Sequence, residues 1–228
     1  MEIDFVITWV DMNDVEWQRD FVKYSNKTEN EKNSVSKARF RDYGLLKFWF
    51  RGVEKFAPWV RKIHFVTCGQ KPEWLDENHP KINFVDHKNF IPEQFLPSYN
   101  SVVIERYLHK IPDLSEHFVY FNDDFYIINH LDKSRFFQNG LPCDISIFQY
   151  NPNWSQWYIR IKNNIRLINL HFDKKEVMNR FYDKWYSPIY GKKLWMNYMM
   201  KFYSKFITLR TPHNAQPFLK SMFEDVWK

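Results

Sequence analysis

Four short runs of β-branched and aromatic residues constrain the fold of this chain more than any other feature. They read IDFVITW (3–9), KIHFVTC (62–68), KINFVDH (81–87) and HFVYFNDD (117–124). Runs of this composition are typical of β-strands. We therefore expect four strands, and we expect them to form the core of the protein.

Helical segments separate these strands. Residues 42–56 carry apolar side chains at helical spacing, at Leu45, Trp49, Val53 and Phe56, and Pro58 closes the helix. Residues 101–111 repeat the pattern at Ile104, Tyr107, Leu108 and Ile111. Strands that alternate with helices indicate a parallel sheet buried on both faces. The prediction is an α/β, Rossmann-like fold, with a mostly parallel sheet flanked by helices.

The second half of the chain is aromatic-rich and less regular. We expect a strand at 143–149, helices at 174–185 and 192–205, a strand and turn at 207–214, and a last helix at 216–228. We interpret the chain as one catalytic domain: a nucleotide-sugar half (1–128), an aromatic-rich mixed insertion (129–210) and a return segment (211–228). The last helix is still running at Lys228, so we expect the C-terminus to be truncated. We interpret DMNDVEW (11–17), after the first strand, as an acidic and polar turn, and the polar residues 25–36 predict a loop.

The composition limits the classes of partner. A net charge of +6 is compatible with phosphate-bearing partners or an anionic membrane surface, although a solvated basic surface is the simpler interpretation. The basic residues are scattered and no recognition motif occurs, so we expect no nucleic-acid binding. With only five glycines there is no glycine-rich phosphate loop, and side chains and helix ends would have to hold phosphates.

The two cysteines, Cys68 and Cys143, have no metal-ligand spacing and fit a reducing compartment. No apolar run is long enough to span a membrane, and the start MEID does not resemble a signal peptide. We expect a cytoplasmic protein, and peripheral association with the inner face of the membrane stays open. The oligomeric state is unknown.

Acidic and amide side chains follow two of the predicted strands. The first strand ends at Trp9-Val10-Asp11, and the fourth ends at Asn122-Asp123-Asp124. Ligands of parallel sheets gather at the carboxyl ends of the strands. If the strand persists, Asn122 and Asp124 share one face, and their oxygens suit Mg²⁺ or Mn²⁺. The alternative is a turn with an Asx hydrogen bond, and the triplet alone leaves the two interpretations even.

Other candidate residues are weaker when each is considered alone. Arg39 and Arg41 could bind phosphate oxygens, with Asp42 as a helix cap, but they also fit an ordinary surface. Glu105 is expected near the first turn of its helix, where an acid also stabilises the helix dipole. His213 could be a general acid or base, or a turn histidine.

Four blocks in this order resemble the Stealth proteins: ITWVDMNDVEW, RFRDYGLLKFWFRGVEKFAPWVRKIHFVT, LPSYNSVVIERYLHKIPDLSEHFVYFNDD and PHNAQPFLKSMFEDVW. These are bacterial capsular polysaccharide phosphotransferases, related to the animal enzyme that adds N-acetylglucosamine-1-phosphate to lysosomal glycans. The resemblance implies transfer of a sugar-1-phosphate from a nucleotide-diphosphate sugar, typically UDP-linked, to a glycan hydroxyl. The product is a phosphodiester in capsular or cell-surface polysaccharide, and nucleoside monophosphate is released.

The resemblance also implies roles for residues. Asp124, Glu105 and His213 match catalytic positions, with His213 as the base on the acceptor hydroxyl and Glu105 in a supporting or metal-linked role. The metal, Mg²⁺ or Mn²⁺, would be held by Asp124, with Asn122 or Asp123 nearby. The substrate-binding set comprises Trp9, Asp11, Asp14, Arg39, Arg41, Asp42, Asn100, Ser101 and Asn122.

The sequence departs from the family at two places. Val102 stands where relatives often carry a histidine, and the chain ends before a downstream arginine thought to be catalytic. Two alternatives to sugar-1-phosphate transfer stay open. One is a glycosyltransferase that uses the same donor, and the other is an inactive protein that binds donor or glycan.

Overall fold

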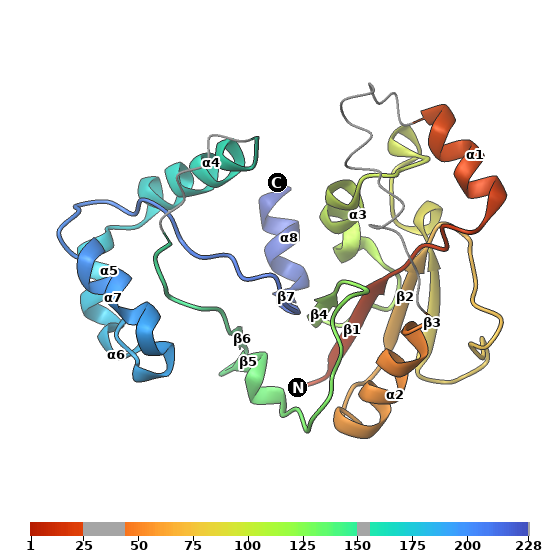
Figure 1. Ribbon diagram of the computed structural model, residues 1–228, viewed down its shortest axis with the longest axis horizontal. Helices are drawn as coiled ribbons and strands as arrows, with labels where there is room; N and C mark the ends of the chain where they lie inside the picture. The colour runs from red at the N-terminus through yellow and green to blue at the C-terminus, as the bar shows by residue number, and fades with distance from the viewer. Residues whose placement is uncertain (25–43, 150–155, 228) are drawn as a thin grey trace. The chain divides into compact units, whose positions relative to one another are not determined.

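The computed structural model of the protein describes residues 1–24, 44–149 and 156–227 (Figure 1). The chain divides into two compact units. The first comprises residues 1–143 and 214–228, and the second comprises residues 144–213. Residues 129–143, which we had grouped with the insertion, belong to the first unit. The predicted loop at 25–36 lies outside the described residues.

The first unit contains a five-stranded sheet in the order β3-β2-β1-β4-β7. Its parallel strands are β1 (Ile3–Thr8), β2 (Ile63–Thr67), β3 (Ile82–Asp86) and β4 (His117–Phe121). In the central strand, Phe5 is paired with Ile63 of β2 on one side and with Val119 of β4 on the other. The predicted α/β, Rossmann-like fold with a mostly parallel sheet is confirmed.

The fifth strand was not predicted. Residues 216–219 form β7 (Gln216–Leu219), which runs antiparallel to β4, and only Lys220–Val226 are helical (α8). The prediction of one helix over 216–228 was therefore wrong at its start. β4 would otherwise be an edge strand with unpaired backbone groups, and pairing with residues 216–219 satisfies them.

Two layers of side chains pack on opposite faces of this sheet. Ile3, Phe5 and Ile7 of β1 pack with Trp49 and Val53 of α2 (Leu46–Phe56). Val6, on the other face of β1, packs with Tyr107 of α3 (Ser101–Tyr107) and Leu108 of the following 3₁₀ turn η4 (Leu108–Lys110). The alternation of side chains along β1 thus assigns α2 and α3 to different faces.

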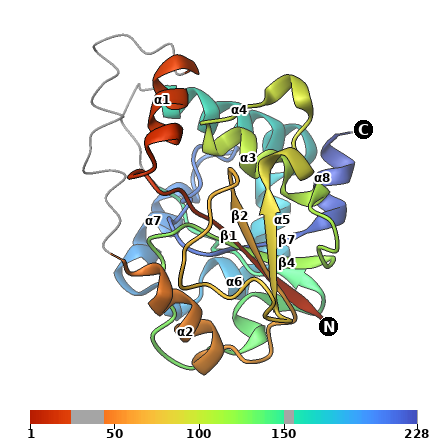
Figure 2. The same cartoon turned by 90° about the vertical axis from the view of Figure 1, so that its right-hand side faces the viewer.

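Helix α1 (Val15–Tyr24) was not predicted, because we had interpreted DMNDVEW (11–17), which includes the first three residues of this helix, as a turn. Figures 1 and 2 both show α1 and α3 toward the end of the sheet where β1 finishes. The remaining short elements of the first unit are η2 (His87–Asn89), η3 (Glu93–Phe95), η5 (Lys133–Arg135) and the hairpin of β5 (Phe137–Gln138) and β6 (Leu141–Pro142).

The second unit is helical. It contains α4 (Gln156–His171), α5 (Lys174–Arg180), α6 (Tyr182–Trp185), η6 (Pro188–Lys193) and α7 (Leu194–Met200). Its core is formed by Phe148, Ile165, Met178, Trp185, Tyr186 and Phe206. The predicted strands at 143–149 and 207–214 are reduced to one bridge between Phe148 and Leu209. Throughout the described ranges, no helix is long and apolar enough to cross a membrane.

Candidate active site

The order of the strands identifies one edge of the sheet as the place for a ligand. From β1 the chain moves outward to β2 and β3, and then returns through α3 to β4 on the other side of β1. The carboxyl ends of β1 and β4 therefore flank a topological switch point. Open α/β sheets bind ligands in the crevice at such a point.

A chain of hydrogen bonds crosses this switch point. The Tyr120 hydroxyl, on β4, donates to Oε1 of Glu105 on α3 at 3.4 Å. The same hydroxyl lies 3.1 Å from Oγ1 of Thr8, the last residue of β1. Because Tyr120 has a single hydroxyl proton and gives it to Glu105, Thr8 supplies the proton of the second bond. Three elements that are distant in sequence thus meet at Glu105.

Burial gives this cluster unusual electrostatics. Burial raises the pKa of Glu105, and the hydrogen bond from Tyr120 opposes that rise only in part. The pKa of Tyr120 is also raised, first by burial and then by the negative charge of Glu105, with a smaller effect from Asp123. The charge of Asp123 therefore acts at the same phenol as Glu105. Perturbed carboxyl groups at a ligand-binding edge are typical of functional sites.

The acidic triplet after β4 is a turn rather than a strand. β4 ends at Phe121, and the N–H of Phe125 donates to the carbonyl of Asn122 at 3.3 Å. Asp123 and Asp124 are exposed, and Asn122 is partly buried. The alternation that grouped Asn122 with Asp124 required the strand to persist, so that argument was wrong. The metal-binding roles of Asp123 and Asp124 stay predictions.

Gln70 links the two acids that follow β1. Its amide Nε2 donates to the carbonyl of Asp11 and to Oδ2 of Asp14, both at 2.9 Å, and its Oε1 accepts from the N–H of Asp11 at 2.8 Å. Asp14 also caps α1 by accepting from the N–H groups of Glu16 and Trp17. The hydrogen bond from Gln70 is the main reason that the pKa of Asp14 is lowered. The structure thus gives Asp11 and Asp14 a role in shaping the loop after β1.

Two further predicted residues hold the start of α3. The side chain of Asn100 accepts from the N–H of Val102 at 3.0 Å and caps the helix, and Ser101 is the first helical residue. Glu105 lies in the second turn of α3, with no acid in the first turn, so a helix-dipole role near the first turn is not supported. Trp9 is partly buried and stacks on Phe65 with ring centroids 5.7 Å apart.

Comparisons with known proteins point to one family. Residues 39–144 match the family described as Stealth protein CR2, conserved region 2. The capsular polysaccharide phosphotransferase WcwK of Streptococcus pneumoniae is 40% identical over 228 residues, which covers all of this chain and 68% of that relative. CpsJ of Streptococcus thermophilus, also a capsular polysaccharide phosphotransferase, is 39% identical over 91% of this chain and 88% of its own length. This chain belongs to the Stealth family.

As a Stealth-family member the chain is a phosphotransferase. A receptor polysaccharide phosphotransferase, WefC of Streptococcus oralis, is also 38% identical over all of this chain and 69% of its own length. The matched Stealth region contains Glu105 and the Asn122–Asp124 turn, whereas Trp9, Asp11, Asp14 and His213 lie outside it.

The remaining predicted residues are not placed at this site by the structure. Arg39, Arg41 and Asp42 lie outside the described residues. His213 is exposed and is the last residue of the second unit, immediately before the chain returns to the first. The roles of these four residues in the Stealth phosphotransferase therefore stay predictions.

The carboxylates at the switch point suit a metal that arrives with a substrate. Carboxylate oxygens are the ligands that Mg²⁺ and Mn²⁺ prefer. Over the described ranges, no three His, Cys, Asp or Glu residues form a ready-made metal cluster. Mg²⁺ is usually held by one or two carboxylates together with substrate phosphates, and Asp123 and Asp124 fit that arrangement.

Two hollows, each of about 350 Å³, lie at opposite ends of the strands. One is at the carboxyl ends of β2 and β3 and includes Cys68, Asp86, His87 and Tyr99. Burial lowers the pKa of His87 to about 4 against the opposing charge of Asp86, so its ring is neutral at pH 7. This hollow shares its edge with the switch point.

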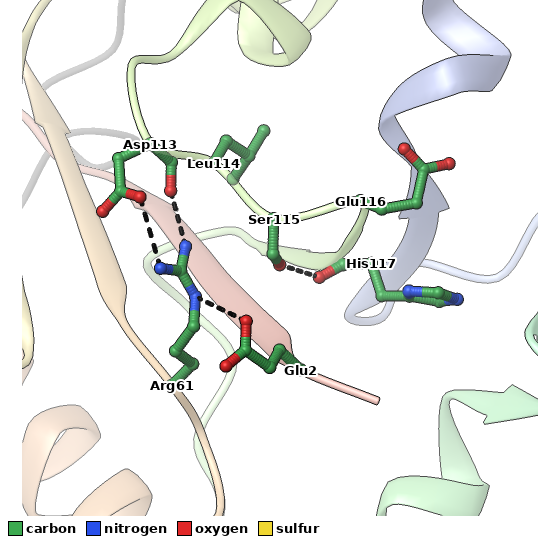
Figure 3. A pocket seen from close by; sticks show the side chains of 7 residues that line it. All are labelled: Glu2, Arg61, Asp113, Leu114, Ser115, Glu116 and His117. Atoms are coloured by element: carbon green, nitrogen blue, oxygen red, sulfur yellow. Dashed lines mark hydrogen bonds and ion pairs between the residues drawn. The ribbon is translucent and has the colours of Figure 1, made fainter.

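The other hollow lies at the amino ends of the strands (Figure 3). Its one arginine, Arg61, binds both oxygens of the buried Asp4 and also pairs with Asp113 and Glu2. A guanidinium that is engaged by three carboxylates is a poor phosphate receptor. We therefore assign this hollow a structural role.

Proposed function

We propose that this phosphotransferase moves a sugar-1-phosphate from a nucleotide-diphosphate sugar, most simply a UDP-linked one, to a hydroxyl group of a glycan. The product is a phosphodiester in capsular or cell-surface polysaccharide, and nucleoside monophosphate leaves. The relatives named as capsular and receptor polysaccharide phosphotransferases support the class of acceptor. The hydrogen-bonded chain Thr8–Tyr120–Glu105 at the switch point is the observation that carries the proposal.

The acceptor oxygen attacks the phosphorus that bears the sugar, and the bond from this phosphorus to the bridging diphosphate oxygen breaks. The anomeric bond of the sugar stays intact, so its configuration is kept. Such a reaction needs positioning and charge neutralisation more than covalent help. Asp123 and Asp124 would hold Mg²⁺ or Mn²⁺, which would supply Lewis-acid stabilisation of the diphosphate charge.

The residues of the chain divide the remaining tasks. Tyr120 orients the carboxylate of Glu105 toward the site, where Glu105 supports the metal-bearing turn. His213 takes the proton of the acceptor hydroxyl. The loop held by Gln70, with Asp11, Asp14 and Trp9, borders the donor. Arg39 and Arg41 bind the phosphates of the donor. Asp42, Asn100, Ser101 and Asn122 complete the proposed substrate-binding set.

The identity of the released nucleotide tests the proposal. The protein would be incubated with a panel of nucleotide sugars, Mg²⁺ and short glycan acceptors, and the products separated by chromatography. Nucleoside monophosphate is the expected product, and Glu105→Gln should abolish its release. Release of the diphosphate would instead establish a glycosyltransferase. Metal-dependent donor binding without turnover would establish a non-catalytic binding protein.

A further inference from the structure

Charge is distributed unevenly between the two units. The second unit, residues 144–213, contains 12 Lys and Arg but only 4 Asp and Glu, a net charge of +8. The rest of the chain contains 21 basic and 23 acidic residues, a net charge of −2. Between Asp183 and Glu224 there is no acidic residue at all. The positive charge of this protein is therefore a property of the helical unit.

Within that unit, α7 and the turn after it present a line of large apolar side chains to solvent. Trp195, Tyr198, Met199 and Phe202 are 59%, 50%, 55% and 87% exposed. The spacing i, i+3 and i+4 places Trp195, Tyr198 and Met199 on one side of α7, and Phe202 follows in the turn after the helix. We call these four residues the aromatic stripe. Such a stripe normally faces a protein core, but here the core lies behind the helix.

The opposite side of α7 packs into the core of the second unit. Asn197 is fully buried, and its amide donates to the carbonyls of Ser146 and Trp185 and accepts from the N–H of Phe148. Leu194, Met196 and Met200 pack against the core of the unit. The helix cannot turn its outward side inward without breaking these bonds. Exposure of the aromatic stripe is thus imposed by the packing.

A buried lysine fixes the end of the stripe in the same way. The ammonium of Lys174 is buried and donates to the carbonyls of Met200 and Tyr203, at 2.5 and 2.6 Å. These carbonyls flank Phe202, so the turn that carries Phe202 is held from behind. The most exposed ring of the stripe is therefore presented on an anchored backbone.

Exposed lysines flank the stripe in the sequence. Lys192 and Lys193 precede α7, and Lys201 and Lys205 follow it. Long lysine side chains extend their charge beyond an apolar surface. Aromatic rings with flanking lysines on a strongly basic unit form the pattern by which peripheral proteins bind the interface of anionic bilayers. We propose that the aromatic stripe and its four lysines dock the protein on a membrane surface rich in anionic lipid.

A glycan fits this surface less well. Sugar-binding sites combine an aromatic platform with polar groups that hydrogen-bond to the hydroxyls. Here the charged residues next to the stripe are all lysines, and the nearby amide of Asn197 points into the core. Docking on lipid requires neither donor nor acceptor, so it stands or falls separately from the proposed function.

Vesicle sedimentation with the full chain tests the proposal. We expect binding to vesicles of phosphatidylcholine with 30% phosphatidylglycerol, and little binding to phosphatidylcholine alone. The double variant Trp195→Ser/Phe202→Ser should reduce the partition coefficient at least about tenfold, because both rings leave the interface. Lys192→Gln and Lys193→Gln should each reduce it about fivefold. Added salt should weaken binding by the wild-type protein.

Matched controls separate docking from general effects. Ile128→Ser removes an apolar side chain that is 84% exposed in the first unit, and Lys47→Gln removes an exposed lysine of α2. Both should bind vesicles as the wild type does, and circular dichroism should show that every variant keeps its fold. Absence of binding to anionic vesicles, or equal losses in the controls, would overturn the proposal. It would also be overturned if the stripe variants abolished self-association or binding of a soluble glycan while vesicle binding persisted.

Discussion

The hydroxyl of Tyr120 donates to the carboxylate of Glu105 across the carboxyl end of the sheet, at 3.4 Å. The two residues are 15 positions apart, on β4 and α3, and the phenol is 5% exposed. This bond holds a half-buried acid at the place where a ligand binds in folds of this type. Substitutions at this hydrogen bond therefore test the proposed chemistry most directly.

Removing the hydroxyl of Tyr120 should leave the carboxylate of Glu105 without the hydrogen bond that orients it. We expect Tyr120→Phe to lower kcat/KM about ten- to a hundredfold, the usual value of a hydrogen bond to a charged group. That bond lowers the pKa of Glu105, so its loss should move the acid limb of the pH–rate profile to higher pH. An unchanged profile would show that Glu105 does not act in its ionised form. Tyr107→Phe, on α3, is the matched control.

Neutralising Glu105 should stabilise the fold while removing activity. Because burial raises its folded-state pKa, ionised Glu105 destabilises the native state above that pKa. Glu105→Gln can still accept the bond from Tyr120, so Tm at pH 8 should rise by about 2–4 °C, the shift expected for roughly 1 kcal/mol. The gain should shrink as pH falls and wild-type Glu105 takes up its proton. Scanning calorimetry between pH 4 and 8 measures this, and a gain independent of pH would contradict it.

The two acids of the turn can be separated by metal titration. If Asp123 and Asp124 hold Mg²⁺, Asp124→Asn and Asp123→Asn should each raise the Mg²⁺ concentration for half-maximal activity at least about tenfold. Asp132→Asn, an exposed acid in the same unit, should leave it unchanged. Chelation with EDTA should stop the wild-type reaction, and added Mn²⁺ should restore it. Full activity in EDTA would exclude the metal.

The close approach of α2 to the segment after the acidic turn should be sensitive to one methyl group. A Cβ at Gly52 would lie 2.5 Å from the carbonyl oxygen of Ile127. Gly52→Ala must therefore push this backbone away, at a cost of about 1–3 kcal/mol in unfolding free energy. Urea denaturation measures the loss, and Lys55→Ala on the same helix should be neutral. The displaced turn should also raise the Mg²⁺ requirement.

The buried network at the amino ends of the strands should affect stability alone. Burial works to raise the pKa of Asp4, but hydrogen bonds from His64, Arg61 and the N–H of Ser115 outweigh it and hold this pKa below its usual value. Asp4 therefore stabilises the protein above the usual carboxyl pKa, and that contribution is lost as pH falls through the lowered value. Asp4→Asn should cost about 3–5 kcal/mol at pH 7 and progressively less in acid. Asp113→Asn, an exposed partner of Arg61, should cost far less.

The local sequence pattern was enough to predict four strands of the sheet and the two helices that flank it. The four strand runs and the helices α2 and α3 follow from composition and spacing, and parallel pairing follows from their alternation. β7 was not predicted, because QPFL carries no strand pattern of its own. Its ladder hydrogen bonds come only from pairing with β4. The helix α1 was not predicted, because Asp14, which caps this helix, was interpreted as part of a turn.

The site shows the same division. Glu105, Asp123 and Asp124 were singled out in the sequence, because acids beside a predicted strand end are unusual and the family resemblance supports them. Thr8, Tyr120 and Gln70 were missed. A tyrosine and a threonine within apolar strands look like ordinary strand residues, and the only available signal was that their hydroxyls need partners when buried.

Sequence alone thus determined the strands, their parallel arrangement and the acids that end one of them, since these depend on residues close together along the chain. Tertiary structure alone decided which side chains meet. Thr8 and Tyr120 are 112 residues apart, and Asp11 and Gln70 are 59 apart. These bonds depend on the order of the strands in the sheet, a property of the whole folded chain and not of any local segment.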